Sequence, residues 1–286
     1  MRAHAPAAAG SDLVTDDHIA LAHRLADTAG EVTRKYFRNR VEVDHKGDDS
    51  PVTIADRQAE EAMRALIHET FPDHGVFGEE HGLKLGPEGS PGRDFVWVLD
   101  PIDGTKSFIT GKPLFGTLIA LTYRGRPVLG VIDQSITRER WLGVAGRPST
   151  LNGEEIATRP CDSVAKAYLY ATTPDMFQGA SAEAFSRVAK ACRIPMYGCD
   201  CYAYGLLAAG LCDLVVEADL KPYDYMALVP IVEGAGGRMT DWRGSDLVWL
   251  PDGMEGGSKK FPGEVCAAGD ARSHAEALAL LAWEGQ

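Results

Sequence analysis

The chain has no hydrophobic run long enough to cross a bilayer. Its longest apolar stretches, such as residues 95–99 and 118–121, fall far short of the roughly 20 residues that a spanning helix needs. The segment from Met1 to Ala9 is too poor in strongly apolar residues to form the core of a signal peptide. We therefore expect no membrane partner and a cytoplasmic location.

Positive charge is also scarce. The 286 residues include 29 Lys and Arg against 41 Asp and Glu, which gives a formal net charge of -12. Proteins that bind the backbone of DNA or RNA neutralise its phosphates with Lys and Arg. The charge balance therefore argues against a nucleic-acid partner and leaves carboxylates available as metal ligands.

Cysteine pairs at zinc or redox spacing are missing. The six cysteines are scattered through apolar segments, unlike a disulfide framework: Cys161, Cys192, Cys199, Cys201, Cys212 and Cys266. Only Cys199 and Cys201 lie close together, and a single intervening residue fits neither the usual zinc spacing nor the redox spacing. We expect reduced, mostly buried thiols with a structural role.

Hydrophobic residues make up 45% of the chain, enough to bury one large core or two closely packed ones. Apolar residues recur at helical spacing from Ile19 to Tyr36, after the capping candidates Thr15 and Asp16. The same pattern returns from Ala59 to Ile67. The spacing predicts two amphipathic helices that pack against each other.

The pattern then changes to short β-prone runs, which predict neighbouring strands of one sheet at 76–77, 95–99, 117–122, 128–132 and 141–144. The later sequence alternates, with strands expected at 168–171 and 214–217 and helices at 182–192, from 202, at 225–233 and at 273–283. This predicts an N-terminal α+β half, 1–150, and a C-terminal α/β half, 151–286, that form one compact unit. Gly, Pro and charge predict the least regular structure at 82–93 and 251–263.

Three acidic clusters stand beside apolar segments: Gly78-Glu79-Glu80, the segment from Asp100 to Thr105, and Tyr223-Asp224. Carboxylates gathered at strand ends can hold hard divalent cations against a phosphate ester. Taken singly, Glu79 and Glu80 would read as a solvated strand end and Asp224 as a helix cap, a role compatible with metal binding. Together the clusters predict a metal-dependent phosphatase.

The segment Asp100-Pro101-Ile102-Asp103-Gly104-Thr105 is the strongest of the three signals. The apolar run 95–99 delivers Asp100 to a strand end, and Pro101 forces a turn that can return Asp103 to the same metal pocket. The carbonyl oxygen of Ile102 is a candidate third ligand. Gly104 and Thr105 open a short helix whose N–H groups can face a phosphate, with Lys106 adding positive charge. The alternative is a plain turn with a solvated aspartate.

Taken alone, Asp56 would be interpreted as a helix cap. Its position in the order of acidic residues along the chain gives a second interpretation. The order of Asp56, Glu79-Glu80, the 100–105 segment, Asp224 and the glycines of 233–237 resembles the inositol monophosphatase family over nearly the whole chain. The resemblance implies an α/β (α+β) fold, a layered α-β-α-β-α sandwich of the inositol monophosphatase and fructose-bisphosphatase type. It also implies a homodimer.

The resemblance further implies a site that holds two or three Mg²⁺ ions. Its implied metal ligands are Glu79, Asp100, the Ile102 carbonyl, Asp103 and Asp224. Asp56 and Thr105 would orient and deprotonate the attacking water with help from Glu79, and the amides of Gly104 and Thr105 would hold the phosphate. The expected reaction is an in-line displacement without a covalent enzyme intermediate.

The segment 198–205 gives separate information on which substrate the site would bind. Inositol-type members tend to carry an Arg-Ser pair where this chain has Asp200 between two cysteines. Asp200 and Glu217 suit a leaving group with positive charge, because ion pairing in a partly desolvated pocket discriminates cations from neutral polyols. These segments are similar to the histidinol-phosphatase branch of the family. We therefore predict hydrolysis of L-histidinol phosphate, a small phosphomonoester of histidine biosynthesis.

Several alternatives stay open at this point. The substrate could be inositol phosphate or another small phosphomonoester, or the chain could be a non-catalytic regulatory protein built on the same scaffold. Asp200 could merely cap the helix that follows. Tyr202, Tyr204 and Tyr223 could line an imidazole-binding wall, or they could belong to the core or a dimer interface.

Overall fold

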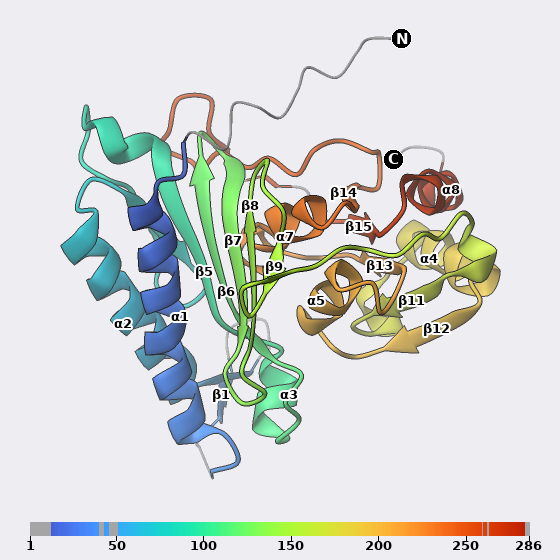
Figure 1. Cartoon of the computed structure of the whole chain (residues 1–286), viewed down its shortest axis with the longest axis horizontal. Coiled ribbons are helices and arrows are strands. Elements are labelled where there is room, and N and C mark those ends of the chain that lie inside the picture. Colours follow the sequence, from blue (N-terminus) through green and yellow to red (C-terminus); the bar gives the residue numbers. More distant parts are fainter. Residues whose placement is uncertain (1–12, 40–42, 46–50, 259, 262, 284–286) are drawn as a thin grey trace.

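The computed structural model describes residues 13–39, 43–45, 51–258, 260–261 and 263–283. Two β-sheets alternate with three layers of helices in these residues, which is the layered α-β-α-β-α arrangement expected (Figure 1). The predicted fold class is therefore confirmed. The segment from Met1 to Ala9, discussed above as a possible leader, lies outside the described residues.

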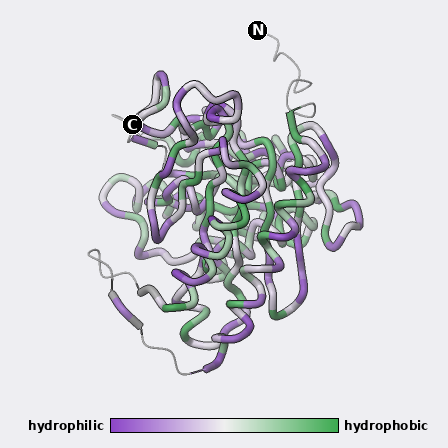
Figure 2. The backbone as a smooth tube through the Cα atoms, turned by 90° about the vertical axis from the view of Figure 1, so that its left-hand side faces the viewer, coloured by the Kyte–Doolittle hydropathy of each residue, from purple (hydrophilic) through white to green (hydrophobic). Residues whose placement is uncertain are grey.

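The first helical layer consists of α1 (Asp16–Tyr36) and α2 (Ile54–Thr70), as the hydrophobic spacing predicted. Thr15 caps α1, where its hydroxyl oxygen accepts the N–H of His18, and Thr53 caps α2 in the same way for Ala55. Both helices bury an apolar stripe that contacts the larger sheet. On this face the tube alternates between hydrophilic and hydrophobic colours along its length (Figure 2).

The larger sheet has eight strands in the order β10-β9-β8-β7-β6-β5-β3-β4. Their bounds are β3 (Gly75–Gly78), β4 (Gly82–Lys84), β5 (Phe95–Asp103), β6 (Gly116–Tyr123), β7 (Arg126–Gln134), β8 (Glu139–Val144), β9 (Thr150–Leu151) and β10 (Glu154–Glu155). All five predicted strands are present and belong to this sheet. A separate antiparallel pair, β1 (Val43–His45) and β2 (Pro51–Thr53), leads into α2.

The second sheet has five strands in the order β12-β11-β13-β15-β14. They are β11 (Tyr168–Ala171), β12 (Ile194–Tyr197), β13 (Leu214–Glu217), β14 (Arg238–Asp241) and β15 (Val265–Ala268). The strands at 168–171 and 214–217 were predicted, whereas β12, β14 and β15 were not. Between 251 and 263, no helix or strand occurs in the residues that are described.

Helices of the C-terminal half lie on both faces of the second sheet. Between the two sheets lie α5 (Tyr202–Ala208), α6 (Pro222–Tyr225) and α7 (Leu228–Gly234), while α4 (Ala180–Ala191) and α8 (Ala271–Leu281) form the outer layer (Figure 1). The single helix predicted at 225–233 was wrong in detail, because two short helices, α6 and α7, occupy this stretch. The break sets Asp224 in the first turn of α6, at the edge of the middle layer.

The middle layer packs directly onto the backbone of the larger sheet. A Cβ atom at Gly130 of β7 would lie 1.9 Å from the carbonyl oxygen of Ala227, and one at Gly143 of β8 would lie 2.4 Å from the backbone nitrogen of Ile231. Such distances exclude any side chain, so glycine allows the closest approach of α7 to the sheet. This contact fixes the height at which α6 and Asp224 stand above the sheet.

Two further observations bear on the composition. No helix in the described part of the chain is long and apolar enough to cross a membrane. All six cysteines carry free thiols, and five of them are buried.

Candidate metal-binding active site

A cavity of about 290 Å³ lies where strand ends of both sheets meet the middle helical layer. It is lined by Glu79, Asp103, Gly104, Thr105, Lys106, Thr172, Met176, Asp200, Cys201, Tyr204, Glu217, Leu220 and Asp224. Eight of these residues were singled out in the sequence, although they lie as much as 145 positions apart. Asp56, Asp100 and Ile102 complete the predicted set and are buried beneath this lining.

Parallel pairing of β3 with β5 explains why two of the acidic clusters meet. Gly78 pairs with Leu99, and the N–H of Glu79 donates to the carbonyl oxygen of Leu99 at 3.2 Å. Glu79 and Asp100 therefore leave adjacent parallel strands at the same sheet edge. The charge of Glu79 contributes to the raised pKa of Asp100, which agrees with their proximity.

The strand β5 continues through Asp103, so the turn expected at Pro101 is an irregular turn within its last residues, where the register with β6 shifts, and it is held by its own hydrogen bonds. The carboxylate of Asp100 accepts the N–H of Ile102 at 3.0 Å, and the carbonyl oxygen of Ile102 accepts the hydroxyl of Thr105 at 3.1 Å. The carboxylate of Asp103 accepts the N–H of Cys201 at 2.6 Å, which ties this turn to the start of α5. Asp100 is only 2% exposed, so the alternative of a solvated turn aspartate is wrong.

Asp224 joins this group from the middle layer. Its carboxylate accepts the N–H of Lys221 at 2.7 Å and so caps α6. One carboxylate oxygen from each of Asp100, Asp103 and Asp224 lies within 4.8 Å of the other two. The capping role and membership in the acidic cluster coexist, as the sequence allowed.

Burial and mutual repulsion shape the titration of this cluster. Burial raises the pKa of Asp100 and of Asp103 well above the ordinary value, and neighbouring carboxylates raise both further. Burial, with a smaller effect of Glu79, raises the pKa of Asp224 to about 7. Asp100 is buried and Asp103 and Asp224 are partly buried, so three carboxylates lie close together with little water around them. All-oxygen sets of this kind fit Mg²⁺. The residues present therefore fit the predicted metal.

Asp56 and Thr105 each make a local bond. The carboxylate of Asp56 accepts the N–H and the hydroxyl of Thr53 at 2.8 and 2.6 Å, while Thr105 donates to Ile102 as described. No hydrogen bond joins the two described side chains directly. Burial raises the pKa of Asp56 to about 6 against the lowering effect of the Thr53 hydrogen bonds. A carboxylate with a pKa near neutrality can exchange a proton under ordinary conditions.

The lining of the cavity also contains Asp200 and Glu217, the two residues predicted to select the substrate. The carboxylate of Asp200 accepts the hydroxyl of Ser107 at 3.2 Å, and α5 has no side-chain cap, so Asp200 does not cap this helix. Glu217 accepts the N–H and the hydroxyl of Thr172 at 3.0 and 2.5 Å on one oxygen and the hydroxyl of Tyr204 at 2.8 Å on the other. One acceptor position on that second oxygen remains open to a ligand.

Tyr202, Tyr204 and Tyr223 have different surroundings in the structure. Tyr204 is buried and lines the cavity, while Tyr202 donates its hydroxyl to Glu139 at 2.7 Å. The ring of Tyr223 contacts Phe77, with 5.7 Å between their centroids. Only Tyr204 is therefore placed to face a ligand in this cavity.

Some residues of the site were not predicted from the sequence. Glu60 is fully buried on α2, and its carboxylate accepts the N–H groups of Glu80 and His81 at 2.7 and 3.1 Å. Thr172 orients Glu217, as described above. One available signal was the position of Glu60 on the apolar face of α2, one residue after Ala59.

The fold and the site define a class of protein: a two-sheet α/β phosphatase with a carboxylate-lined cavity between the sheets. The family model described as "Inositol monophosphatase family" matches residues 15–284. The chain belongs to this family, as the sequence resemblance indicated, and it is a phosphatase of the family.

Individual relatives agree on the family and differ in their names. The chain is 53% identical over 273 residues to "Bifunctional phosphatase IMPL2, chloroplastic" of Arabidopsis thaliana, covering 96% of this chain and 77% of the relative. It is 35% identical over 250 residues to a histidinol-phosphatase of Chlorobaculum parvum, covering 87% and 95% of the two chains. A solved inositol monophosphatase from Zymomonas mobilis superposes with a TM-score of 0.81 at 48% identity, covering 93% of this chain and 98% of that one.

Proposed function

We propose that the chain is a Mg²⁺-dependent phosphomonoester hydrolase whose preferred substrate is L-histidinol phosphate. The observation that carries the proposal is one cavity with two kinds of carboxylate: the close cluster of Asp100, Asp103 and Asp224, and the separate pair of Asp200 and Glu217. The first kind suits cations that bind phosphate, and the second suits a cationic leaving group.

In this proposal Glu79, Asp100, the Ile102 carbonyl, Asp103 and Asp224 hold two or three Mg²⁺ ions. When bound, these ions supply Lewis-acid stabilisation to the phosphate oxygens and activate the attacking water. Asp56, with Glu79 nearby, takes the proton of that water, and Thr105 orients it. Gly104, Thr105 and Lys106 line the wall where the phosphate sits and contribute backbone N–H groups and one positive charge.

Asp200 and Glu217 would then bind the positively charged part of the leaving group. The ammonium and imidazole groups of histidinol phosphate offer positive charge and N–H donors, which a neutral polyol lacks. Asp200 keeps one oxygen free of Ser107, and Tyr204 adds an aromatic face beside Glu217. The histidinol-phosphatase names of two relatives at 35% and 34% identity support this choice, and the inositol monophosphatase name of the 48% identical structure supports the alternative.

The test measures kcat/KM with Mg²⁺ for L-histidinol phosphate and for inositol 1-phosphate. We expect the first substrate to be preferred, and we expect Asp200→Asn to lower the ratio of the two values by about tenfold, since it removes one charged contact. The ratio is the readout because Asp200 also lies near Asp103 and could affect both substrates through the metal site. Asp175→Asn, at an exposed position on the neighbouring loop, is the control.

Three results would contradict parts of the proposal separately. Equal or better cleavage of inositol 1-phosphate would reject the proposal that Asp200 and Glu217 recognise a cationic leaving group. It would leave the proposed phosphatase activity standing. Persistence of both activities in Asp100→Asn would reject the metal site itself. Cleavage of neither substrate by the wild type would favour the regulatory alternative.

The same proposal extends to the oligomeric state, the division of the chain and its location. We propose a homodimer, and a division in which the N-terminal half, 1–150, supplies most metal ligands while the C-terminal half, 151–286, supplies Asp224 and the substrate-selecting residues. We also propose a cytoplasmic location, although the name of the Arabidopsis relative includes "chloroplastic". Fractionation of the source cells and the sedimentation of the purified protein test these two points.

A further inference from the structure

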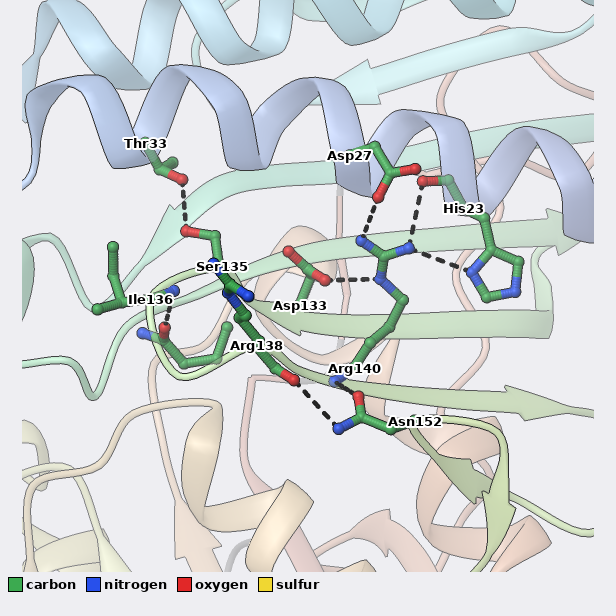
Figure 3. A network of polar contacts seen from close by, with 10 residues as sticks. His23, Asp27, Thr33, Asp133, Ser135, Ile136, Arg138, Arg140 and Asn152 are labelled. Atoms are coloured by element: carbon green, nitrogen blue, oxygen red, sulfur yellow. Dashed lines mark hydrogen bonds and ion pairs between the residues drawn. The ribbon is translucent and has the colours of Figure 1, made fainter.

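A second cavity, with a volume of about 610 Å³, lies on the opposite side of the larger sheet from the middle helices, between α1 and strands β7 to β9 (Figure 3). It is lined by His23, Asp27, Arg34, Asp133, Ser135, Arg138, Arg140, Leu142, Thr150, Asn152 and Gly153. None of these residues lines the candidate active site. Its volume falls within the range of roughly 300 to 1,000 Å³ typical of small-molecule sites.

Arg140 forms a fixed wall of this cavity. Its guanidinium donates to Asp133 at 2.6 Å and to Asp27 at 2.7 Å, and it lies 3.3 Å from Nδ1 of His23 (Figure 3). Two carboxylates therefore compensate its single charge. Arg140 has little capacity left for a ligand, but it holds α1 against the strands and keeps the cavity in shape.

Arg34 and Arg138 differ from Arg140, because neither guanidinium has a hydrogen bond or ion pair to any described residue. Arg34 lies back over its own helix: a Cβ atom at Gly30 would lie 2.8 Å from its Nη1 atom. This position directs the charge toward Ser135 and the cavity. Its nearness also lowers the pKa of Asp133 against the raising effect of burial.

The backbone around Arg138 is held in an unfavourable conformation. Its φ angle is 60°, in the left-handed region that costs a residue with a side chain about 1 kcal/mol or more. Asn152 clamps this turn from β9: its side chain donates to the carbonyl oxygen of Arg138 at 3.1 Å and accepts the N–H of Arg140 at 2.9 Å. The turn therefore presents Arg138 at a fixed place on the cavity rim.

The charges of the lining favour an anion. Three arginines face two aspartates, in a chain whose formal net charge is -12. The guanidinium fork matches the oxygens of phosphates and carboxylates, and two uncompensated forks suit a ligand with at least two negative charges. We propose that this cavity is a second ligand site, which binds a small multivalent oxyanion, a phosphorylated or polycarboxylate metabolite, through Arg34 and Arg138.

Calorimetric titration of the full chain with pyrophosphate, and separately with citrate, tests the proposal. The protein and the buffer are passed over a chelating resin and contain no divalent cation, so that the carboxylates of the candidate active site repel both probes. We expect saturable binding of one anion per chain for at least one probe, and the responding probe identifies a phosphate or a carboxylate ligand. The double variant Arg34→Gln/Arg138→Gln should weaken binding by about tenfold or more, since it removes two charged donors.

The matched control is Arg24→Gln/Arg243→Gln, which removes the same charge from exposed positions outside the cavity and should bind as the wild type does. Unchanged thermal unfolding of both double variants shows that they fold. Three results would overturn the proposal: no saturable binding of either probe, equal weakening in the control variant, or weakening by Lys106→Gln in place of the cavity variant. The last would assign the anion to the candidate active site.

Discussion

At the scale of single residues, His274 is a buried histidine outside the site. It lies on α8 at 6% exposure, and its Nε2 atom is 3.0 Å from the hydroxyl oxygen of Thr240. Burial, with a smaller effect of the positive charge of Arg238, lowers its pKa to about 4. The folded protein therefore binds a proton at His274 less readily than the unfolded chain does.

This difference predicts the sign of one pH effect on stability. A histidine with a lowered pKa in the folded state contributes stability above its ordinary pKa of 6.5, and that stability is lost as the pH falls toward about 4. His274→Gln removes this titration. We expect the wild type to lose about 1 to 2 kcal/mol more unfolding free energy than the variant between pH 7 and pH 4.5.

Urea unfolding of the wild type and the variant, each measured at several pH values with EDTA present, gives this difference. The comparison between the two proteins cancels the carboxylates of the site, whose raised pKa values act in the opposite direction. His68→Gln, at an exposed position on α2, controls for the loss of a histidine as such. Parallel pH curves for wild type and His274→Gln would show that the burial of His274 has no effect on stability.

At the scale of elements, α2 supports the turn that carries Glu79. The buried carboxylate of Glu60 binds the N–H groups of Glu80 and His81 and forms a 2.6 Å ion pair with Arg64. A Cβ atom at Gly78 would lie only 2.1 Å from this carboxylate, so glycine at the end of β3 makes the contact possible. The position of Glu79 therefore depends on a helix that supplies no residue to the cavity lining.

Glu60→Gln tests this support. The new amide replaces an acceptor with a donor, so at least one of these hydrogen bonds is lost, and we expect a cost of about 1 to 3 kcal/mol in unfolding free energy. We also expect about tenfold weaker Mg²⁺ activation, because residues that orient metal ligands affect affinity on this scale. Glu61→Gln, on the exposed side of the same helix, should change neither value. Unchanged Mg²⁺ activation in Glu60→Gln would limit Glu60 to a role in stability.

The same elements show what could be predicted from the sequence. Long periodic segments such as α1 were predicted almost to the residue, because hydrophobic spacing and capping act locally. The short strand β12 was missed because its four residues are mostly exposed and show no clean alternation. Likewise, the sequence did not predict the break between α6 and α7 in the expected helix at 225–233, since the break depends on the close contact of α7 with the sheet.

The site divides in a similar way. The acidic clusters were visible because each lies beside an apolar segment, and their order along the chain, which resembles that of the family, related them to one another. The contact of Ser107 with Asp200 joins residues 93 positions apart and follows from the packing of the two halves. The contact of Thr172 with Glu217 joins residues 45 positions apart and follows from the parallel pairing of β11 with β13. The sequence therefore predicts which residues form the site, while the tertiary fold determines which hydrogen-bond partners orient them.

At the scale of the whole molecule, the acidic cluster connects the larger sheet to the middle helical layer. Asp100 and Asp103 leave β5 of the larger sheet, and Asp224 stands on α6 of the middle layer. Without a cation these carboxylates repel one another across the junction. Their raised pKa values mean that the folded state binds protons more tightly than the unfolded chain. The associated stability is present at low pH and is lost as the pH rises through about 6 for Asp56 and about 7 for Asp224.

Binding of Mg²⁺ should therefore stabilise both halves at once, and more strongly at pH 8 than at pH 5. A ligand at a hundred times its dissociation constant adds about 2.7 kcal/mol, which calorimetry detects as a higher unfolding temperature. Hydrogen exchange should show added protection in both β5 and α6, with sodium chloride at equal ionic strength as the control. Asp100→Asn should raise the unfolding temperature of the metal-free protein and reduce the Mg²⁺ effect. Added protection in one half alone would mean that the cluster does not join β5 and α6 through a shared ion.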